Sequence, residues 1–436
     1  MVQRIFLGAF LITFVNWTHA QQKEGTRLPG NQAFYAKLQT LIDAAKNNPR
    51  LAAADAKVKA SEANERSQRS LEAPQVAMEF YQSPVSSFPN PFKNQMEYDY
   101  SIQQMIPFPG KLGAMAQSEQ KRTDMLAADK QTEEQEITRN VKELYFDLYL
   151  KYRQLELNGQ TQTLVRELVK IARTQYENGA GKQSDILRAQ TELSTFVNDS
   201  IVLFQQIKSM EGMINALCNR PVTTDIGFVP EMSPAMKSYD LNALLFIAEK
   251  KRPELKSMVK GIEMQQAELI ATQKEYLPDF MVRGMYKQMM QGSDDWSLMI
   301  GATVPIAPWS RGKISSSARR ADENIRIAQS ERENMINIIS SEVNDALLKV
   351  ESAKERLKLS RESVIPQAEQ TLESALAAYR TGKQEFLTLI EIQRMLVMAK
   401  LDYHMAVMML LDGQSRLERS VGISLEEIDK ELERGN

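Results

Sequence analysis

The chain has 436 residues, with 54 Lys and Arg against 56 Asp and Glu and a formal net charge of −2. This balance excludes the strongly basic surface of a nucleic-acid-binding protein, so no nucleic-acid partner is expected. The single cysteine, Cys218, excludes an intramolecular disulfide and a multi-cysteine zinc site. With only two histidines, the sequence gives no basis for an enzyme, and we expect no catalytic residue, no cofactor and no metal-ligating residues.

The chain begins with the features of an export signal. Arg4 precedes an apolar run at residues 5–15, and small or polar residues follow up to Ala20. A charged start, a short apolar region and a small-residue cleavage site are typical of a secretory signal peptide. We therefore predict a signal peptide at 1–20 and an exported protein, with an N-terminal segment and short helix at 21–47.

The rest of the chain contains two copies of one pattern. Motifs in the first half recur 202 to 204 residues later, and a near-constant spacing of this kind is the signature of an internal repeat. We predict repeat 1 at 48–230 and repeat 2, with a C-terminal tail, at 231–436. The recurring pairs are Pro49 and Pro253, Pro74 and Pro278, Gly110-Lys111 and Gly312-Lys313, and Tyr176-x-x-Gly179 and Tyr379-x-x-Gly382.

Each copy starts with a helix and continues with two strands. The helices are expected at 50–73 and 254–277, between the paired prolines. Apolar and polar residues then alternate with a period of two, which predicts strands with one apolar, aromatic-rich face. The strands are expected at about 75–84 and 95–107 in the first copy, and at about 279–290 and 296–305 in the second.

Unusually long helices follow the strands. Residues 112–178 and 314–381 lack internal loop signals, and at 1.5 Å per residue each helix reaches about 100 Å. We interpret Gly159 and Pro366 as bends within these helices, because the apolar periodicity resumes beyond both. Shorter helices return at 184–216 and 385–412. A helical hairpin of this length cannot fit inside a compact domain and must project from the sheet.

The strands have the length and alternation of membrane-crossing strands with a polar interior. Four strands cannot close into a barrel, and open sheet edges are not tolerated in lipid, so several chains must contribute to one barrel. The alternative is an ordinary soluble sheet, solvated on one face. In that case the chain would be a soluble periplasmic coiled-coil adaptor or scaffold protein.

The sequence resembles the TolC-like family of outer-membrane efflux proteins over about residues 34–423. Two ordered sets of motifs, one in each half, carry the resemblance. They are Asn48-Pro49-Arg50-Leu51, Ile106-Pro107-Phe108-Pro109-Gly110-Lys111-Leu112, Tyr176-Glu177-Asn178-Gly179, Asp185-Ile186-Leu187-Arg188-Ala189-Gln190, Arg252-Pro253-Glu254-Leu255, Tyr276-Leu277-Pro278, Val304-Pro305-Ile306 and Tyr379-Arg380-Thr381-Gly382.

The resemblance implies a mostly helical fold with a small β part, containing four strands and four long helices per chain. It also implies a homotrimer with a twelve-stranded barrel in outer-membrane lipid and a twelve-helix tunnel in the periplasm of a Gram-negative bacterium. Such proteins are passive ducts. They receive substrates from an inner-membrane pump, and a periplasmic adaptor (membrane fusion) protein docks on the tunnel tip.

The resemblance also assigns candidate site residues. Family members narrow the tunnel with acidic residues on the helices that return from the tip, and Thr388 departs from this pattern. The aperture candidates are Asp185, Arg188, Thr388 and Glu391. The adaptor-docking candidates at the tip are Tyr176, Gly179, Tyr379 and Gly382. The strand-to-helix turns are assigned to Pro107, Pro109, Gly110, Lys111, Gly312 and Lys313.

The sequence does not decide which substrate, or passenger, is transported. The candidates are metal ions, drug-like amphiphiles and secreted polypeptides. The Pro-Phe-Pro-Gly-Lys stretch is most similar to members that export cations or heavy metals with pumps of the resistance-nodulation-division type. Twenty-three methionines invite a copper or silver interpretation, because thioethers are soft ligands. We nevertheless interpret most of them as core-filling residues of helices, as at Met395, Met398, Met405 and Met408.

Overall fold

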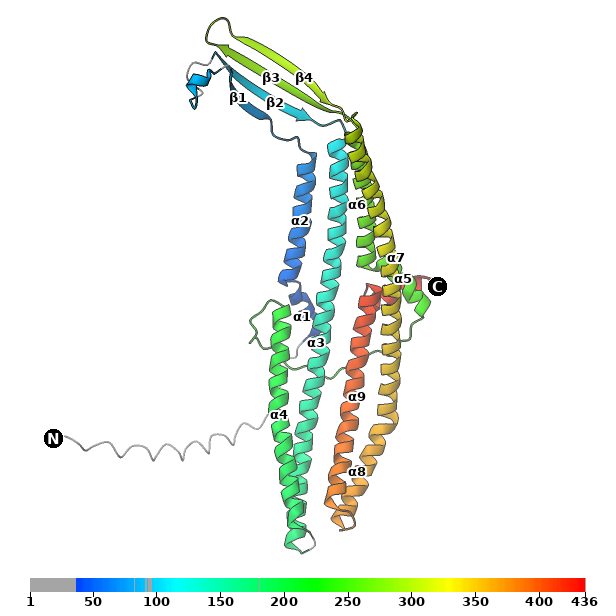
Figure 1. Ribbon diagram of the computed structural model, residues 1–436. Coiled ribbons are helices and arrows are strands. Elements are labelled where there is room, and N and C mark those ends of the chain that lie inside the picture. The colour runs from blue at the N-terminus through cyan, green and yellow to red at the C-terminus, as the bar shows by residue number, and fades with distance from the viewer. Residues whose placement is uncertain (1–36, 82, 91, 93–95, 180, 436) are drawn as a thin grey trace, which may run out of the picture.

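The computed structural model describes residues 37–81, 83–90, 92, 96–179 and 181–435. The predicted signal peptide lies outside these residues. A four-stranded sheet occupies one end of an elongated molecule, and long helices run from it to two turns at the opposite end (Figure 1). The predicted fold class, a mostly helical chain with four strands and long helices, is confirmed.

The two copies contribute matching helices and strands in the same order, with an additional short turn in the first copy and an additional C-terminal helix in the second. In the first copy these are α1 (Leu38–Ala45), α2 (Pro49–Arg69), β1 (Gln75–Tyr81), the short 3-10 turn η1 (Val85–Ser87), β2 (Glu97–Ile106), α3 (Lys111–Glu177) and α4 (Gln183–Leu217). In the second copy they are α5 (Leu241–Lys251), α6 (Pro253–Lys274), β3 (Asp279–Met289), β4 (Asp295–Thr303), α7 (Pro308–Leu359), η2 (Ser360–Val364), α8 (Ile365–Arg380), α9 (Phe386–Val421) and α10 (Leu425–Gly435).

The two expected helix breakers have different surroundings. Gly159 lies inside α3, which continues through it without interruption. Pro366 lies in the first turn of α8, directly after the π turn η2. Proline lacks an N–H group and its ring clashes with the preceding turn of an α-helix, so a wider turn at this point accommodates it.

The sheet has the order β1-β2-β3-β4, with every neighbouring pair antiparallel. Its register aligns Met78, Tyr100, Tyr286 and Trp296 across the four strands. The alternating apolar residues of all four strands therefore share one face, as the period of two predicts. This face is open to the surroundings, and Trp296 is 79% exposed. Among the described helices, none combines the length and the apolar character needed to cross a bilayer.

The helices bury their apolar residues in three clusters along the molecule. The largest joins α3, α4, α7 and α9 around Tyr145 and Tyr149. A second joins α5, α7, α9 and α10 around Leu244 and Ile428. The third lies near the far turns and joins α3, α4, α8 and α9 around Leu389. The apolar side chains thus pack in several places along the helices and do not form a single central core.

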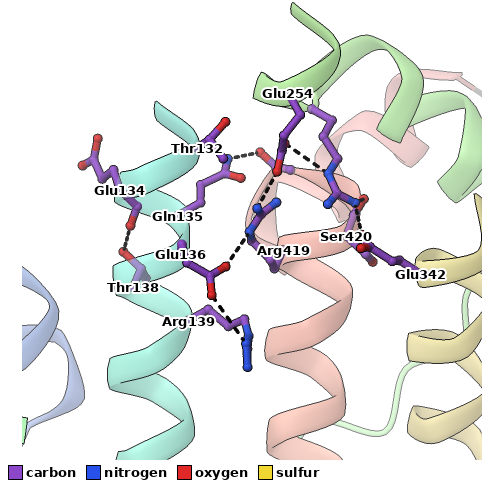
Figure 2. A network of polar contacts seen from close by, with 12 residues as sticks. Thr132, Glu134, Gln135, Glu136, Thr138, Arg139, Glu254, Glu342, Arg419 and Ser420 are labelled. Atoms are coloured by element: carbon purple, nitrogen blue, oxygen red, sulfur yellow. Dashed lines mark hydrogen bonds and ion pairs between the residues drawn. The ribbon is translucent and has the colours of Figure 1, made fainter. Parts of the chain in front are cut away.

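A polar network ties the first copy to the second near the middle of the molecule (Figure 2). The guanidinium of Arg419, on α9, contacts Glu136 of α3 and Glu254 of α6. The buried Arg252 donates to the carbonyl of Ser420 at 3.0 Å and also pairs with Glu254. Burial alone would raise the pKa of Glu254, but these two arginines outweigh it and hold its pKa below the usual range.

Candidate functional site

The site is built on the two turns at the end of the molecule farthest from the sheet (Figure 1). Gly179 follows α3 with φ of +70°, and Gly382 follows α8 with φ of +71°. In both turns the glycine amide donates to the carbonyl of the tyrosine three residues earlier, at 3.0 Å. Left-handed backbone is strained for residues with a Cβ atom, which explains the glycine of each Tyr-x-x-Gly motif.

The two tyrosines of these motifs have different surroundings. Tyr176 is 47% exposed, whereas Tyr379 is 3% exposed and packs against Phe386 with ring centroids 5.6 Å apart. Burial raises the pKa of Tyr379 to about 12, and its hydroxyl has no hydrogen-bond partner among the described residues. Tyr176 is thus available to a partner, whereas Tyr379 belongs to the core beside the turn.

Two polar links join the hairpins of the two copies near the tip. The side-chain amide of Gln175, on α3, donates to the carbonyl of Tyr379 at 2.9 Å. Arg394, on α9, forms a two-pronged pair with Glu192 of α4, at 2.8 and 2.5 Å. Neither link is predicted from the sequence. A pattern of apolar residues does not reveal which polar side chains of two packed hairpins meet.

The four aperture candidates lie just beyond the turns, on α4 and α9. Asp185 is half-buried in the first turn of α4, and Arg188 is exposed one helical turn later. Thr388 is half-buried and Glu391 is exposed on α9. Within the described part of the chain none of them forms an ion pair, so the exposed Arg188 and Glu391 are free to face a partner or a passage.

The strand-to-helix turn of the first copy is tied to the second copy. Pro107 and Pro109 precede Gly110, which has φ of +90° and directly precedes the first residue of α3. The ammonium of the buried Lys111 donates to Asp279 at 2.7 Å and to the carbonyl of Leu277 at 2.9 Å. This contact fixes the sheet relative to the long helix α3.

The second copy departs from the expected turn. Gly312 and Lys313 lie inside α7, because the helix begins earlier at Pro308, in the sequence that is inserted relative to the first copy. Proline is well suited to a first helical turn, where its missing N–H is not needed. Lys313 is exposed and has no ion pair within the described residues.

Among the described residues, no group of three His, Cys, Asp or Glu side chains could hold a metal ion. The tip consists of two helical hairpins joined by side-chain links at a largely exposed end. Such links can break without unfolding a helix.

Comparisons with known proteins agree with this picture. Residues 41–209 and 244–422 match the family described as Outer membrane efflux protein. No curated protein matches the chain. Similar solved structures include the outer-membrane channel OprN, with 17% identity, a TM-score of 0.73 and coverage of 88% of this chain and 89% of that chain.

Two further structures are similar in fold. VceC from Vibrio cholerae is 16% identical with a TM-score of 0.72, over 89% of this chain and 96% of its own. CusC is 17% identical with a TM-score of 0.74, over 91% of this chain and 95% of its own. At such identities these structures share the fold, and the family match carries the functional conclusion.

Proposed function

The chain belongs to the family of outer membrane efflux proteins, and on that premise we propose that three copies form a passive duct from the periplasm to the outside. The family consists of non-enzymatic channels of tripartite efflux systems. This chain is accordingly an outer-membrane channel of a Gram-negative bacterium that extends into the periplasm, and the alternative of a soluble adaptor or scaffold is set aside.

The open sheet supports an assembly of several copies, and the number three comes from the resemblance to the TolC-like family. β1 and β4 are its two edges and each has one neighbouring strand in the described chain. Unpaired N–H and C=O groups at such edges are not tolerated in lipid, and the apolar face around Trp296 needs an apolar surrounding. Pairing β4 of one copy with β1 of the next satisfies both edges. Three copies then form a twelve-stranded barrel and a twelve-helix tunnel.

The tip is the part of the duct that meets the other components. We assign the exposed Tyr176 and the Gly179 and Gly382 turns to docking of a periplasmic adaptor, which connects the duct to an inner-membrane pump. Tyr379 supports the turn from within the core. Asp185 and Glu391, with Arg188 and Thr388 beside them, are proposed to line the closed aperture. The helical links at Gln175 and Arg394 hold the aperture closed in this account.

Metal cations are the passengers that we propose, with drug-like amphiphiles and secreted polypeptides as the alternatives. The sequence similarity of the first strand-to-helix turn to cation exporters supports this choice. The test is deletion of the gene in its host, followed by growth inhibition with copper, silver, zinc, cobalt, bile salts, dyes and antibiotics. Sensitivity to metals alone supports cation export, whereas sensitivity to amphiphiles alone contradicts it.

A further inference from the structure

Methionine side chains gather on the face of the sheet opposite to the apolar one. Residues of this face alternate with the aromatic residues, and many are polar, such as Asp99, Ser101 and Gln103. Five methionines from three strands share it, and one of them, Met289, lies at the end of β3 opposite Glu97. We refer to the other four as the thioether cluster, which consists of Met105 of β2, Met281 and Met285 of β3, and Met299 of β4.

The strand register brings these side chains together. Met105 is paired directly with Met281, and Met299 is paired with Arg283, between Met281 and Met285 along the strand. Directly paired side chains have Cβ atoms about 5 Å apart, and diagonal neighbours are about 7–8 Å apart. Met105 is thus a direct neighbour of Met281, and Met299 is a diagonal neighbour of both Met281 and Met285, so the four thioethers form a continuous chain of neighbours across three strands.

Two contacts describe the interior of the cluster. A Cβ atom added at Gly301 would lie 3.1 Å from the methyl carbon of Met281, so this thioether extends over the glycine toward β4. The guanidinium of Arg283 donates to the hydroxyl of Ser101 at 3.3 Å, on the side of Met285. The thioether groups of Met105 and Met281 thus lie next to each other. The guanidinium of Arg283 points toward Ser101.

Core packing does not account for these methionines. They project from the face that lines the wet interior of a closed barrel, where polar side chains are the rule. Met299 is 51% exposed, and Met105, Met281 and Met285 are half-buried. By contrast, Met408 on α9 packs against the largest core cluster. The core-filling prediction is wrong for Met395 and Met398 of the same helix, which are 55% and 66% exposed. A group of accessible thioethers on a polar face is suited to soft ligand chemistry.

We propose that the thioether cluster is a transit site for soft monovalent cations, Cu(I) or Ag(I), inside the barrel. The proposal rests on the duct function above and deepens it by naming the passenger class. Thioether sulfur is a neutral, soft ligand that selects Cu(I) over hard cations. Because thioethers do not ionise, binding needs no release of a proton from the cluster.

The charges around the cluster favour this class over divalent ions. Arg283 repels any cation, and neutral sulfur gives a strongly hydrated Zn²⁺ or Co²⁺ no carboxylate to compensate. The carboxylates on this face are already paired: Asp279 pairs with Lys111, and Glu97 and Asp99 both pair with Lys287. A weak, uncharged site also meets the requirement of conduction that a passenger enters and then leaves.

The test measures Ag(I) binding to the purified full-length channel in detergent by calorimetry, with X-ray absorption to identify the ligand atoms. All variants carry Cys218→Ser, because a thiol binds silver. We expect sulfur-coordinated silver, and at least a tenfold loss of affinity when Met105, Met281, Met285 and Met299 are all replaced by Leu. The matched control replaces Met395, Met398, Met405 and Met408 of α9 by Leu and keeps wild-type affinity. Zn²⁺ and Co²⁺ give no comparable binding.

The possible results distinguish a failure of the transit site from a failure of the proposed duct function. An equal loss of silver affinity in both quadruple variants, or wild-type affinity in the cluster variant, overturns the transit site. Absence of sulfur-bound silver in a channel that still conducts also overturns it and leaves the duct intact. A wild-type chain that forms no conducting channel refutes the proposed function, and the transit site with it. In cells, we expect the cluster variant to be sensitised to silver and copper but not to bile salts.

Discussion

The ammonium of Lys111 lies 2.7 Å from the carboxylate of Asp279, and this pair joins the first helical residue of α3 to the first residue of β3. Lys313 is the repeat equivalent of Lys111 and is exposed on α7. The same residue in the two copies thus ties the sheet to the helices in one case and faces solvent in the other.

Replacing Lys111 by Ala should destabilise the junction between sheet and helices. The change leaves the Asp279 carboxylate with only the amide of Phe108 as a partner. Removing one partner of a buried pair costs about 3–5 kcal/mol, and the partial exposure of Asp279 reduces this to about 2 kcal/mol. Chemical denaturation of the detergent-solubilised protein measures the change. Lys313→Ala is the control and should alter stability by less than about 0.5 kcal/mol; equal effects would contradict this account of Lys111.

Replacing Arg394 by Ala should favour the open tip. The variant removes the two-pronged pair with Glu192, which contributes on the order of 1 kcal/mol because Arg394 is itself exposed. A loss of this size shifts a closed-to-open equilibrium about fivefold. Single-channel recording should detect longer open times. Exchanging the charges, with Glu192→Arg and Arg394→Glu in one variant, should restore closure. The control is Arg173→Ala, which changes an exposed residue without a described ion pair and should not alter the open times. Unchanged open times in Arg394→Ala would exclude this link as a latch.

Replacing Glu391 by Gln should weaken the preference of the channel for cations. A carboxylate at the narrowest point of a pore attracts cations, and the amide has the same shape without the charge. Reversal potentials in a salt gradient measure this preference. If both preference and conductance equal those of the wild type, Glu391 does not line the aperture, and the same measurement on Asp185→Asn then examines the other acidic candidate.

The stability of the helical part should fall at acid pH partly because of His404. Its Nδ1 atom lies 2.9 Å from the hydroxyl of Tyr149, and burial, with a smaller effect of Arg153, lowers its pKa in the folded protein. The unfolded chain therefore binds a proton more readily, and the stabilisation present above pH about 6.5 is lost as the pH falls below that value. His404→Gln keeps a hydrogen-bonding side chain without this titration. Thermal unfolding at pH 7.5 and 5 should show a smaller loss in the variant, and equal losses would contradict the assignment.

The sequence predicted the elements because their signals are periodic and occur twice. The alternation in 97–106 and 279–289 identified strands with a single apolar face, and the Tyr-x-x-Gly motifs located both tip turns. The register confirmed the common apolar face. The earlier start of α7 was missed because Pro308 lies in inserted sequence that has no counterpart in the first copy.

Other features depend on how helices and strands are placed relative to one another. Gln175 bonds a backbone carbonyl, which carries no sequence signal. Equal motifs predict equal roles for Tyr176 and Tyr379, but the packing of Phe386 buries only the second. Likewise, the methionine cluster requires three strands in a defined register, whereas the sequence indicated only that the chain is rich in methionine.

The central claim is that three copies close one membrane-spanning channel, and the most direct measurement is the mass and conductance of the purified chain. Light scattering in detergent, corrected for bound detergent, determines the number of copies, and reconstitution of the same sample in a planar bilayer determines whether it conducts. The account predicts a trimer with discrete single-channel currents, and lengthened openings in the Arg394→Ala variant. A monomer that leaves the bilayer without current would contradict it.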